Sequence, residues 1–296
     1  MKIDGVFSGG GVKAFAFIGA LEIIAERNLK FERVAGTSAG SILAAFIAAG
    51  YNSEEMKRLL ETLDLKQFLD PPLLANIIPG SKWFFLYFQM GLYKGDKFER
   101  WIHEQLAQRN IYTFGDIKSG YLKVVVSDLS LGKLVVIPDD LERVYGINPN
   151  DFPIAKAVRM SAGFPYFFMP KKVIGKNKVK SLIVDGGLLS NFPIWVFESE
   201  TNKRTRPILG MKLSDSPEQS HPNNIKNALD MLHALFSTMK QAHDSRYIAK
   251  SEKHNIIFIP VKDVHTTNFM INEEVKKKLI QNGREHAQKF LKHWST

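Results

Sequence analysis

Near the start of the chain, two patterns of apolar residues alternate along the sequence. Short apolar runs typical of strands are each followed by a segment whose apolar positions recur every three or four residues, as in a helix. The expected elements are strand 3–7, helix 12–23, strand 31–35 and helix 41–49. This β-α-β-α order predicts neighbouring parallel strands joined by a right-handed crossover.

The same two periods continue to the end of the chain. We expect strands at 122–126 and 134–137 to form an antiparallel hairpin. Later elements are expected at helix 154–161, strands 182–184, 208–213 and 255–260, and helices 225–239 and 273–293. Because no linker or repeat interrupts this pattern, the sequence favours one α/β domain over residues 1–296, with its motifs in residues 1–200 and further helices and strands in residues 201–296.

Composition narrows the class of protein. The chain has no cysteine, which excludes a disulfide framework, a thiolate metal site and a cysteine nucleophile. Hydrophobic residues make up 45% and charged residues 24%, a balance typical of a folded globular protein. The formal charge of +10 favours anionic partners, which include a membrane surface, nucleic acid and a phosphorylated substrate.

Neither a membrane-spanning segment nor a signal peptide is expected from the sequence. No apolar stretch reaches the roughly 18 residues that a spanning helix needs. The apolar run at 14–21 is followed at once by Glu22 and lacks a small-residue cleavage site. The sequence therefore predicts a protein that is cytoplasmic or bound peripherally to a membrane.

A serine stands in the turn after the second predicted strand. Gly36, Ser38 and Gly40 fit the pattern G-x-S-x-G, in which small residues allow a sharp strand-to-helix turn that exposes the serine hydroxyl. The pattern favours Ser38 as a nucleophile. The alternative is an ordinary turn in which Ser38 caps the following helix.

Three glycines, Gly9, Gly10 and Gly11, follow the first predicted strand. Backbone N–H groups of such a loop at a helix start bind an anion, either a phosphate or the oxyanion of acyl transfer. About one crossover separates Gly11 from Ser38, so both turns are expected at the same edge of the sheet. A dinucleotide site is disfavoured because the second strand does not end in an acidic residue, and no P-loop pattern occurs.

Activation of Ser38 needs a base, and three residues are candidates. Asp185 lies between a short apolar strand and a double glycine. The alternative is that this aspartate has only a structural role in forming the turn. A buried aspartate accepts a serine proton when burial raises its pKa from about 3.9 towards neutrality. Asp128, at the end of another strand, competes for this role, and His265 is the best of the eight histidines for a Ser-His-Asp triad.

These motifs together resemble those of the patatin-like phospholipases, a family of serine acyl hydrolases. The segments that carry the resemblance are Gly9-Gly10-Gly11-Val12-Lys13-Ala14, Gly36-Thr37-Ser38-Ala39-Gly40 and Asp185-Gly186-Gly187. Further matches lie at residues 161–165 and 191–193, and a weaker one lies at 244–247. The likeness therefore extends from the first residues to about residue 200.

The resemblance implies a three-layer α/β/α sandwich around a mainly parallel sheet. It also implies Ser38 as the nucleophile and Asp185 as the base, with no metal or cofactor. The implied oxyanion donors are the backbone N–H groups of Gly9, Gly10, Gly11 and Ala39. Lys13 matches the basic position of the family pattern, whereas Ala14 replaces its last glycine. Alanine is favourable there if the residue already lies in the helix.

The same resemblance implies a lipid substrate with fatty-acyl ester bonds. Beside an acyl-hydrolase site, the +10 charge favours peripheral contact with an anionic membrane surface over nucleic acid. Aromatic residues at 83–93 form either core packing or a lid over the acyl chain, and lysines at 171–180 form either a solvated face or a lipid-binding patch. The competing hypothesis is a non-catalytic basic module that binds lipid or nucleotide through the glycine loop.

Overall fold

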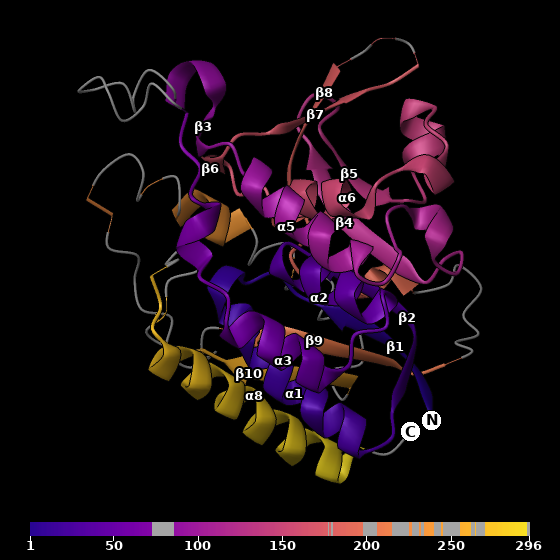
Figure 1. Ribbon diagram of the computed structural model, residues 1–296, viewed down its shortest axis with the longest axis vertical. Helices are drawn as coiled ribbons and strands as arrows, with labels where there is room; N and C mark the ends of the chain where they lie inside the picture. Colours follow the sequence, from indigo (N-terminus) through magenta and orange to yellow (C-terminus); the bar gives the residue numbers. More distant parts are fainter. Residues whose placement is uncertain are drawn as a thin grey trace.

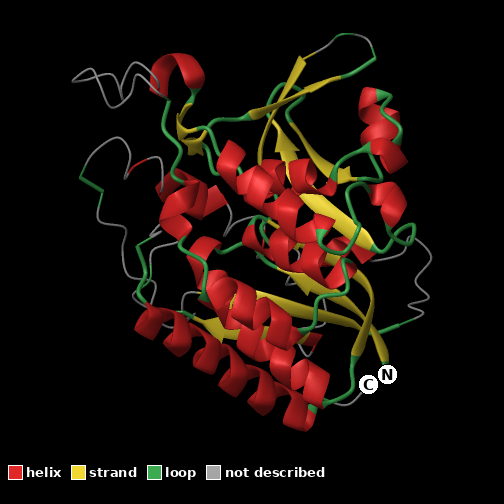
Figure 2. Cartoon of the chain, viewed as in Figure 1, coloured by secondary structure: helices red, strands yellow, loops and turns green. Residues whose placement is uncertain are grey.

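The computed structural model of the chain describes residues 1–72, 86–176, 178, 180–197, 206–214, 255–261 and 270–294, together with positions 225–226, 231, 234–239, 244 and 264. Within these residues, the centre is an eight-stranded sheet flanked by helices (Figure 1, Figure 2). Its strands lie in the order β10 (Ile256–Pro260), β9 (Ile208–Ser214), β1 (Lys2–Phe7), β2 (Lys30–Thr37), β4 (Leu122–Asp128), β8 (Lys180–Asp185) and β7 (Lys171–Ile174), with β5 (Lys133–Ile137) paired to β4.

Strand directions confirm the predicted α/β class. The strands from β10 to β4 run parallel to their neighbours, as the crossover pattern predicts. β5, β8 and β7 pair antiparallel, and β4 with β5 forms the predicted hairpin. A separate two-stranded ribbon pairs β3 (Gly91–Tyr93) with β6 (Tyr166–Phe168) in parallel.

Helices agree closely with the predicted periods. The longer ones are α1 (Phe15–Glu26), α2 (Ala39–Ala48), α3 (Ser53–Glu61), α5 (Asp96–Ala107), α6 (Ile154–Ser161) and α8 (Glu273–His293). Short helical turns are η1 (Gly11–Ala14), η2 (Leu65–Phe68), η4 (Phe114–Asp116), η5 (Leu141–Tyr145), η6 (Pro149–Asp151), η7 (Gly186–Leu188) and η8 (Ile194–Phe197). Of the helix expected at 225–239, residues 231 and 234–239 are helical and most others lie outside the described residues. No helix in the described part of the chain is long and apolar enough to span a bilayer.

Both faces of the sheet are buried. Ile3 and Phe7 of β1 join a large apolar cluster with the helices, whereas Val6 joins a smaller cluster around η8. This alternation follows because successive side chains of a strand point to opposite faces. On the larger side, α8 packs so closely on α1 that a Cβ at Gly19 or Gly283 would overlap the backbone of the other helix. The sheet therefore forms a rigid base for the loops at its edge.

Strand β4 brings together the two strands that carry the serine and aspartate motifs. Val125 pairs with Thr37, the last residue of β2, and the next residue, Val126, pairs with Asp185, the last residue of β8. Because β5 pairs with residues 124–128 along the other edge of β4, β2 and β8 share one edge and meet end to end. The turn after β2 is thereby placed next to Asp185.

Candidate active site

The turn at Ser38 is as sharp as the sequence predicts. β2 ends at Thr37 and α2 begins at Ala39, so Ser38 alone joins strand to helix, with φ 52° and ψ −128°. A residue that carries a side chain rarely adopts this left-handed backbone φ, and such strain is typical of a nucleophile turn. A Cβ at Gly36 would overlap the Gly40 carbonyl, and a Cβ at Gly40 would overlap the Phe7 carbonyl, so packing requires glycine at both positions.

A second serine holds this strained turn in place. The buried Ser38 N–H donates to Ser161 Oγ at 2.9 Å, and Ser161 Oγ donates to the Val125 carbonyl at 2.6 Å. Ser161 stands at the end of α6 and is fully buried. Its hydroxyl therefore ties the turn to β4. Sequence reasoning placed Ser161 in a family match but assigned it no role.

We expect Ser161→Ala to lower the free energy of unfolding by about 1–3 kcal/mol, because the buried Ser38 N–H loses its acceptor. The measurement is urea unfolding followed by circular dichroism. Ser181→Ala is the matched control, since Ser181 is equally buried but its hydroxyl has no hydrogen bond within the described residues. Equal losses in the two variants would contradict a specific role for Ser161.

Ser38 and Asp185 form a direct hydrogen bond. Ser38 Oγ donates to Asp185 Oδ2 at 2.7 Å, and the other carboxylate oxygen accepts from Gly187 N–H at 2.7 Å. Both side chains are largely shielded from water, with Ser38 8% and Asp185 3% exposed. Gly186 lies against the Val125 carbonyl, where a Cβ would not fit. The double glycine thus lets the aspartate turn pack onto β4.

The glycine loop lies beside the serine, but not all of its N–H groups are available. A Cβ built on Gly9 would lie 3.0 Å from Ser38 Cβ, so the two backbones approach closely. The Gly9 N–H donates to the Asn191 carbonyl at 2.9 Å and is therefore already engaged. This bond corrects the expectation that Gly9 donates to an oxyanion. The N–H groups of Gly10, Gly11 and Ala39 have no acceptor within the described residues.

The two residues after the glycines behave differently. Ala14 has φ −64° at the junction of η1 and α1, so the alanine that replaces the pattern's last glycine carries no left-handed strain. Lys13 is half-buried in η1, and its N–H donates to the Gly10 carbonyl at 3.1 Å. That bond closes the loop into the helix start.

Asp128, the competing aspartate, bonds to residues other than Ser38. Asp128 accepts from Tyr145 Oη at 2.7 Å and from Leu131 N–H at 2.9 Å. Burial, reinforced by the bond to Asp128, raises the pKa of Tyr145, so the phenol remains a donor. His265 lies outside the described residues. Among the described residues, no cluster of three acidic or histidine side chains could hold a metal ion.

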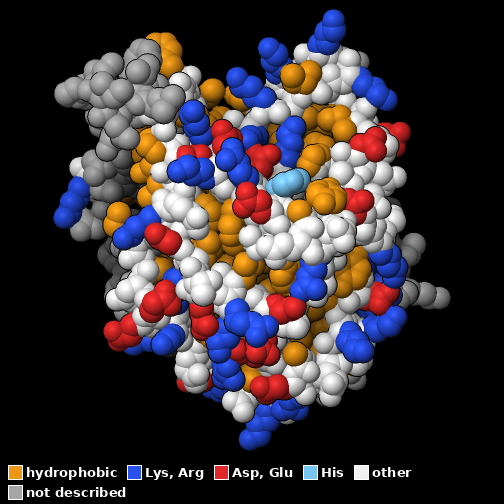
Figure 3. All heavy atoms as spheres, viewed as in Figure 1, with side chains coloured by type: hydrophobic (Ala, Val, Ile, Leu, Met, Phe, Trp, Pro, Cys, Tyr) orange, Lys and Arg blue, Asp and Glu red, His pale blue; other side chains and the backbone are white. Residues whose placement is uncertain are grey.

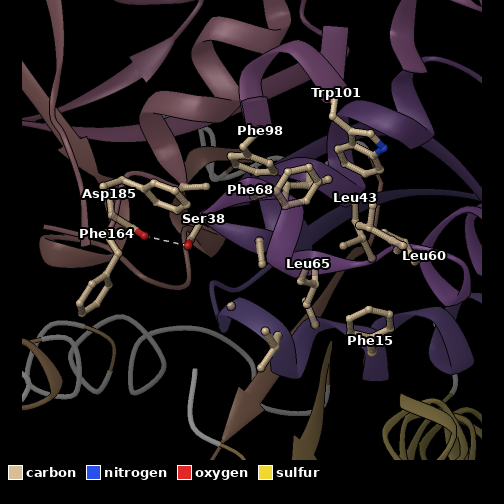
Figure 4. A pocket seen from close by; sticks show the side chains of 18 of the residues that line it. Phe15, Ser38, Leu43, Leu60, Leu65, Phe68, Phe98, Trp101, Phe164 and Asp185 are labelled. Carbon is tan, nitrogen blue, oxygen red and sulfur yellow. Dashed lines mark hydrogen bonds between the residues drawn. The ribbon is translucent and has the colours of Figure 1, made fainter. Parts of the chain in front are cut away.

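An apolar pocket opens from the Ser38–Asp185 pair (Figure 4). Phe164 lies near the pair, whereas Trp101 and Leu60 lie at the far end in this view. The walls come from η1, α1, α2, the end of α3 and the segment after it, α5 and the segment that contains β6. The rings of Phe68 and Trp101, 5.3 Å apart between centroids, pack in one wall. Of the expected aromatic segment 83–93, residues 83–85 lie outside the described residues.

Buried Arg159 supports this wall from behind. Its guanidinium lies 4.7 Å from the centroid of the Phe168 ring and donates to the Gly95 and Lys94 carbonyls at 3.0 and 2.7 Å. A third bond reaches the Met169 carbonyl at 3.0 Å. Burial lowers the pKa of Arg159 to about 10, which still leaves it charged at neutral pH. Arg159 thus joins α6 to both strands of the ribbon.

Two solved structures share this fold. VipD from Legionella pneumophila has a TM-score of 0.60 and 17% identity, with 99% of this chain and 67% of VipD covered. The type III effector ExoU of Pseudomonas aeruginosa has a TM-score of 0.51 and 18% identity, with 98% of this chain and 53% of ExoU covered. At these identities the likeness concerns the fold alone.

Sequence relatives extend over the whole chain. It is 47% identical over 295 residues to the uncharacterized protein YqhO of Bacillus subtilis (strain 168), with both chains fully covered. It is 25% identical over 302 residues to protein R571 of Acanthamoeba polyphaga mimivirus, with 97% of this chain and 94% of R571 covered. Residues 5–198, which contain the Ser38 turn, the glycine loop and Asp185, match the sequence profile of the patatin-like phospholipases. The chain therefore belongs to the patatin-like phospholipase family.

Proposed function

We propose that this protein is a lipid acyl hydrolase that cleaves fatty-acyl ester bonds through an acyl-enzyme on Ser38. Membership of the patatin-like phospholipase family supports lipid hydrolysis in general. The observation that carries the specific proposal is the 2.7 Å hydrogen bond from Ser38 Oγ to Asp185 Oδ2 at one end of an apolar pocket. A nucleophile in contact with a base, next to space for an acyl chain, is what ester hydrolysis of a lipid requires.

The proposed reaction has two steps. Asp185 accepts the Ser38 proton as Ser38 Oγ attacks the ester carbonyl, and the protonated carboxyl then gives that proton to the departing alcohol. The acyl group is left as an ester of Ser38. Asp185 next takes a proton from a water molecule as that water attacks the acyl-enzyme. The protonated Asp185 then gives this proton to Ser38 Oγ as the fatty acid leaves. The enzyme is thereby restored without any other reactant.

Backbone donors stabilise the negative oxygen in both steps. We assign this role to the N–H groups of Gly10, Gly11 and Ala39, which have no acceptor within the described residues. Ala39 opens α2, so its N–H also lies at the positive end of the helix dipole. Loss of one such donor typically lowers kcat by roughly 10²–10³-fold. The loop therefore matters nearly as much as the Ser38–Asp185 pair.

A fluorophosphonate probe tests the proposal directly. It reacts with an activated serine, so we expect mass spectrometry of the labelled, folded protein to find the adduct on Ser38. The probe should compete with a fatty-acyl ester substrate. Absence of labelling on Ser38, with the fold intact by circular dichroism, would favour the competing hypothesis of a non-catalytic lipid- or nucleotide-binding module.

The far end of the pocket is expected to limit acyl-chain length. Trp101 lines the pocket at this end (Figure 4), so Trp101→Leu opens apolar space beyond the end of a bound chain. Each methylene that newly fits should raise kcat/KM about fourfold, the equivalent of ~0.8 kcal/mol per buried CH₂. The measurement is kcat/KM over a series of p-nitrophenyl esters of increasing chain length. Trp294→Leu, a half-buried tryptophan outside this pocket, should leave the optimum unchanged.

A further inference from the structure

One end of the molecule carries large apolar side chains that the core does not bury. Tyr87 is 80% exposed, Phe88 62% and Ile174 59%, and Met90 and Tyr166 are also exposed. Single exposed apolar residues are ordinary on a protein surface, but a group of them at one end marks an interaction site. We call Tyr87, Phe88, Met90 and Tyr166 the aromatic rim.

The aromatic rim is built on the ribbon that borders the pocket. Gly91, which follows Met90, pairs with Tyr166, and Tyr166 stands between pocket residues Phe164 and Phe167. Met90 and Tyr166 have left-handed backbone φ angles of 57° and 62°, which residues with a side chain rarely adopt. The backbone conformation at these two exposed residues is therefore strained.

The neighbouring β7–β8 hairpin is strongly basic. Lys172, Lys176, Lys178 and Lys180 are exposed and form no ion pair with any described residue. By contrast, Lys171 is bound to Asp96 and Glu99. In the hairpin register Lys172 lies opposite Leu182, and Ile174 lies opposite Lys180. Lysines thus alternate with apolar side chains on the hairpin.

Both features lie at the same end of the molecule. Figure 1 shows β3, β6 and the β7–β8 hairpin at one end of the long axis, with α8 at the other. At the hairpin end, Figure 3 shows mostly Lys and Arg side chains with an apolar side chain among them. The ribbon and the hairpin are also adjacent in the sequence, since only two residues separate β6 from β7.

From these observations we infer that the hairpin and the aromatic rim form a docking surface for an anionic lipid bilayer. Lysines near an anionic membrane each contribute about fivefold in affinity, the equivalent of ~1 kcal/mol. Aromatic side chains suit the boundary between headgroups and acyl chains, and Ile174 among the lysines adds apolar contact. Nucleic acid would use the same charges, and its bases would stack on the aromatic rings, but it offers no apolar layer for Met90 and Ile174. A bilayer fits the lysines, the aromatic rings and these aliphatic side chains together.

Docking in this way would bring the ribbon that borders the pocket against the bilayer. Phe164 and Phe167 line the pocket on either side of Tyr166 in the sequence, so an acyl chain leaving the bilayer at the ribbon would meet a wall of the pocket that also contains Ser38. This use of the surface rests on the proposed acyl hydrolase function. Binding to vesicles does not, and the two are tested separately.

Flotation with vesicles provides the test. We expect wild-type protein to bind vesicles of phosphatidylcholine mixed with phosphatidylglycerol, and to bind pure phosphatidylcholine much more weakly. Lys172→Glu/Lys180→Glu should weaken binding at least about 25-fold, since two lysines are lost and two repulsive charges are added. Lys289→Glu/Lys292→Glu on α8 changes the net charge equally at the opposite end and should bind as wild type does.

Two further measurements make the inference decisive. Phe88→Ser/Ile174→Ser keeps every charge and should also weaken vesicle binding, whereas an undiminished affinity would overturn the apolar part of the surface. Equal losses in the hairpin and α8 charge variants would overturn the site. DNA binding that depends on the hairpin lysines, without vesicle binding, would assign the surface to nucleic acid instead.

Hydrolysis of a water-soluble short-chain ester separates docking from catalysis. Lys172→Glu/Lys180→Glu should leave kcat/KM for this ester unchanged, because neither residue lines the pocket. Protein that binds vesicles through the hairpin but hydrolyses no ester would refute the proposed function and leave the docking surface standing. Protein that hydrolyses the ester but never binds anionic vesicles would refute the docking surface alone.

Discussion

Replacement of Ser38 by alanine is expected to lower kcat for ester hydrolysis by about 10⁴-fold or more. The acyl-enzyme forms on Ser38 Oγ in the proposed mechanism, and without that atom only the oxyanion donors and substrate binding still accelerate the reaction. Steady-state hydrolysis of a soluble ester measures the loss. The same variant should no longer react with a fluorophosphonate.

The fold should survive this change. Alanine is no bulkier than serine, and the Ser38 N–H keeps its acceptor at Ser161. Ser181→Ala, at a buried position outside the site, should retain wild-type kcat and full labelling. Activity within tenfold of wild type in Ser38→Ala, with normal circular dichroism, would remove Ser38 from the reaction and contradict the proposal.

Local signals explain why much of this fold could be predicted. The strand-to-helix turn at Ser38 depends on small residues that are adjacent in sequence, so the pattern alone indicates it. α6 and α8 begin and end where the period of three to four residues begins and ends. The parallel pairing of β1 with β2 follows from the crossover helix between them. Each prediction needed only residues close together in the chain.

The choice among the proposed oxyanion donors depends on a contact that the sequence does not reveal. Gly9, Gly10 and Gly11 are chemically identical, so nothing local tells which N–H is engaged. Asn191 decides this, because its carbonyl accepts from Gly9 and its side-chain amide also lies 3.4 Å from the Gly9 carbonyl. These residues are far apart in sequence, and only tertiary packing brings them together.

The supporting residues were missed for the same reason. The role of Ser161 rests on its hydrogen bonds to Ser38, which follows β2, and to Val125 in β4. The charged Arg159 lies in an amphipathic helix, where an exposed position would be the usual interpretation. Its burial becomes intelligible only when three backbone carbonyls surround it. A short stretch of sequence carries the nucleophile motif, but not the shell that orients it.

Comparison of Asp185→Asn with Asp128→Asn should identify the base. Both aspartates are buried at the ends of neighbouring strands, and the sequence left both as candidates. Asp185→Asn is expected to lower kcat by about 10²–10⁴-fold, because an amide cannot accept the Ser38 proton. Its oxygen still accepts from Gly187 N–H, so the turn should remain folded. Steady-state kinetics on a soluble ester provide the measurement.

Asp128→Asn should stay within a fewfold of wild-type kcat. Asparagine at this position accepts from Leu131 N–H and donates to the Tyr145 hydroxyl, so both contacts of Asp128 have a replacement. A large loss in Asp128→Asn with an active Asp185→Asn would reverse the assignment of the base. Full activity in both variants would instead direct the search to a histidine, since Ser38 Oγ still needs a group that takes its proton.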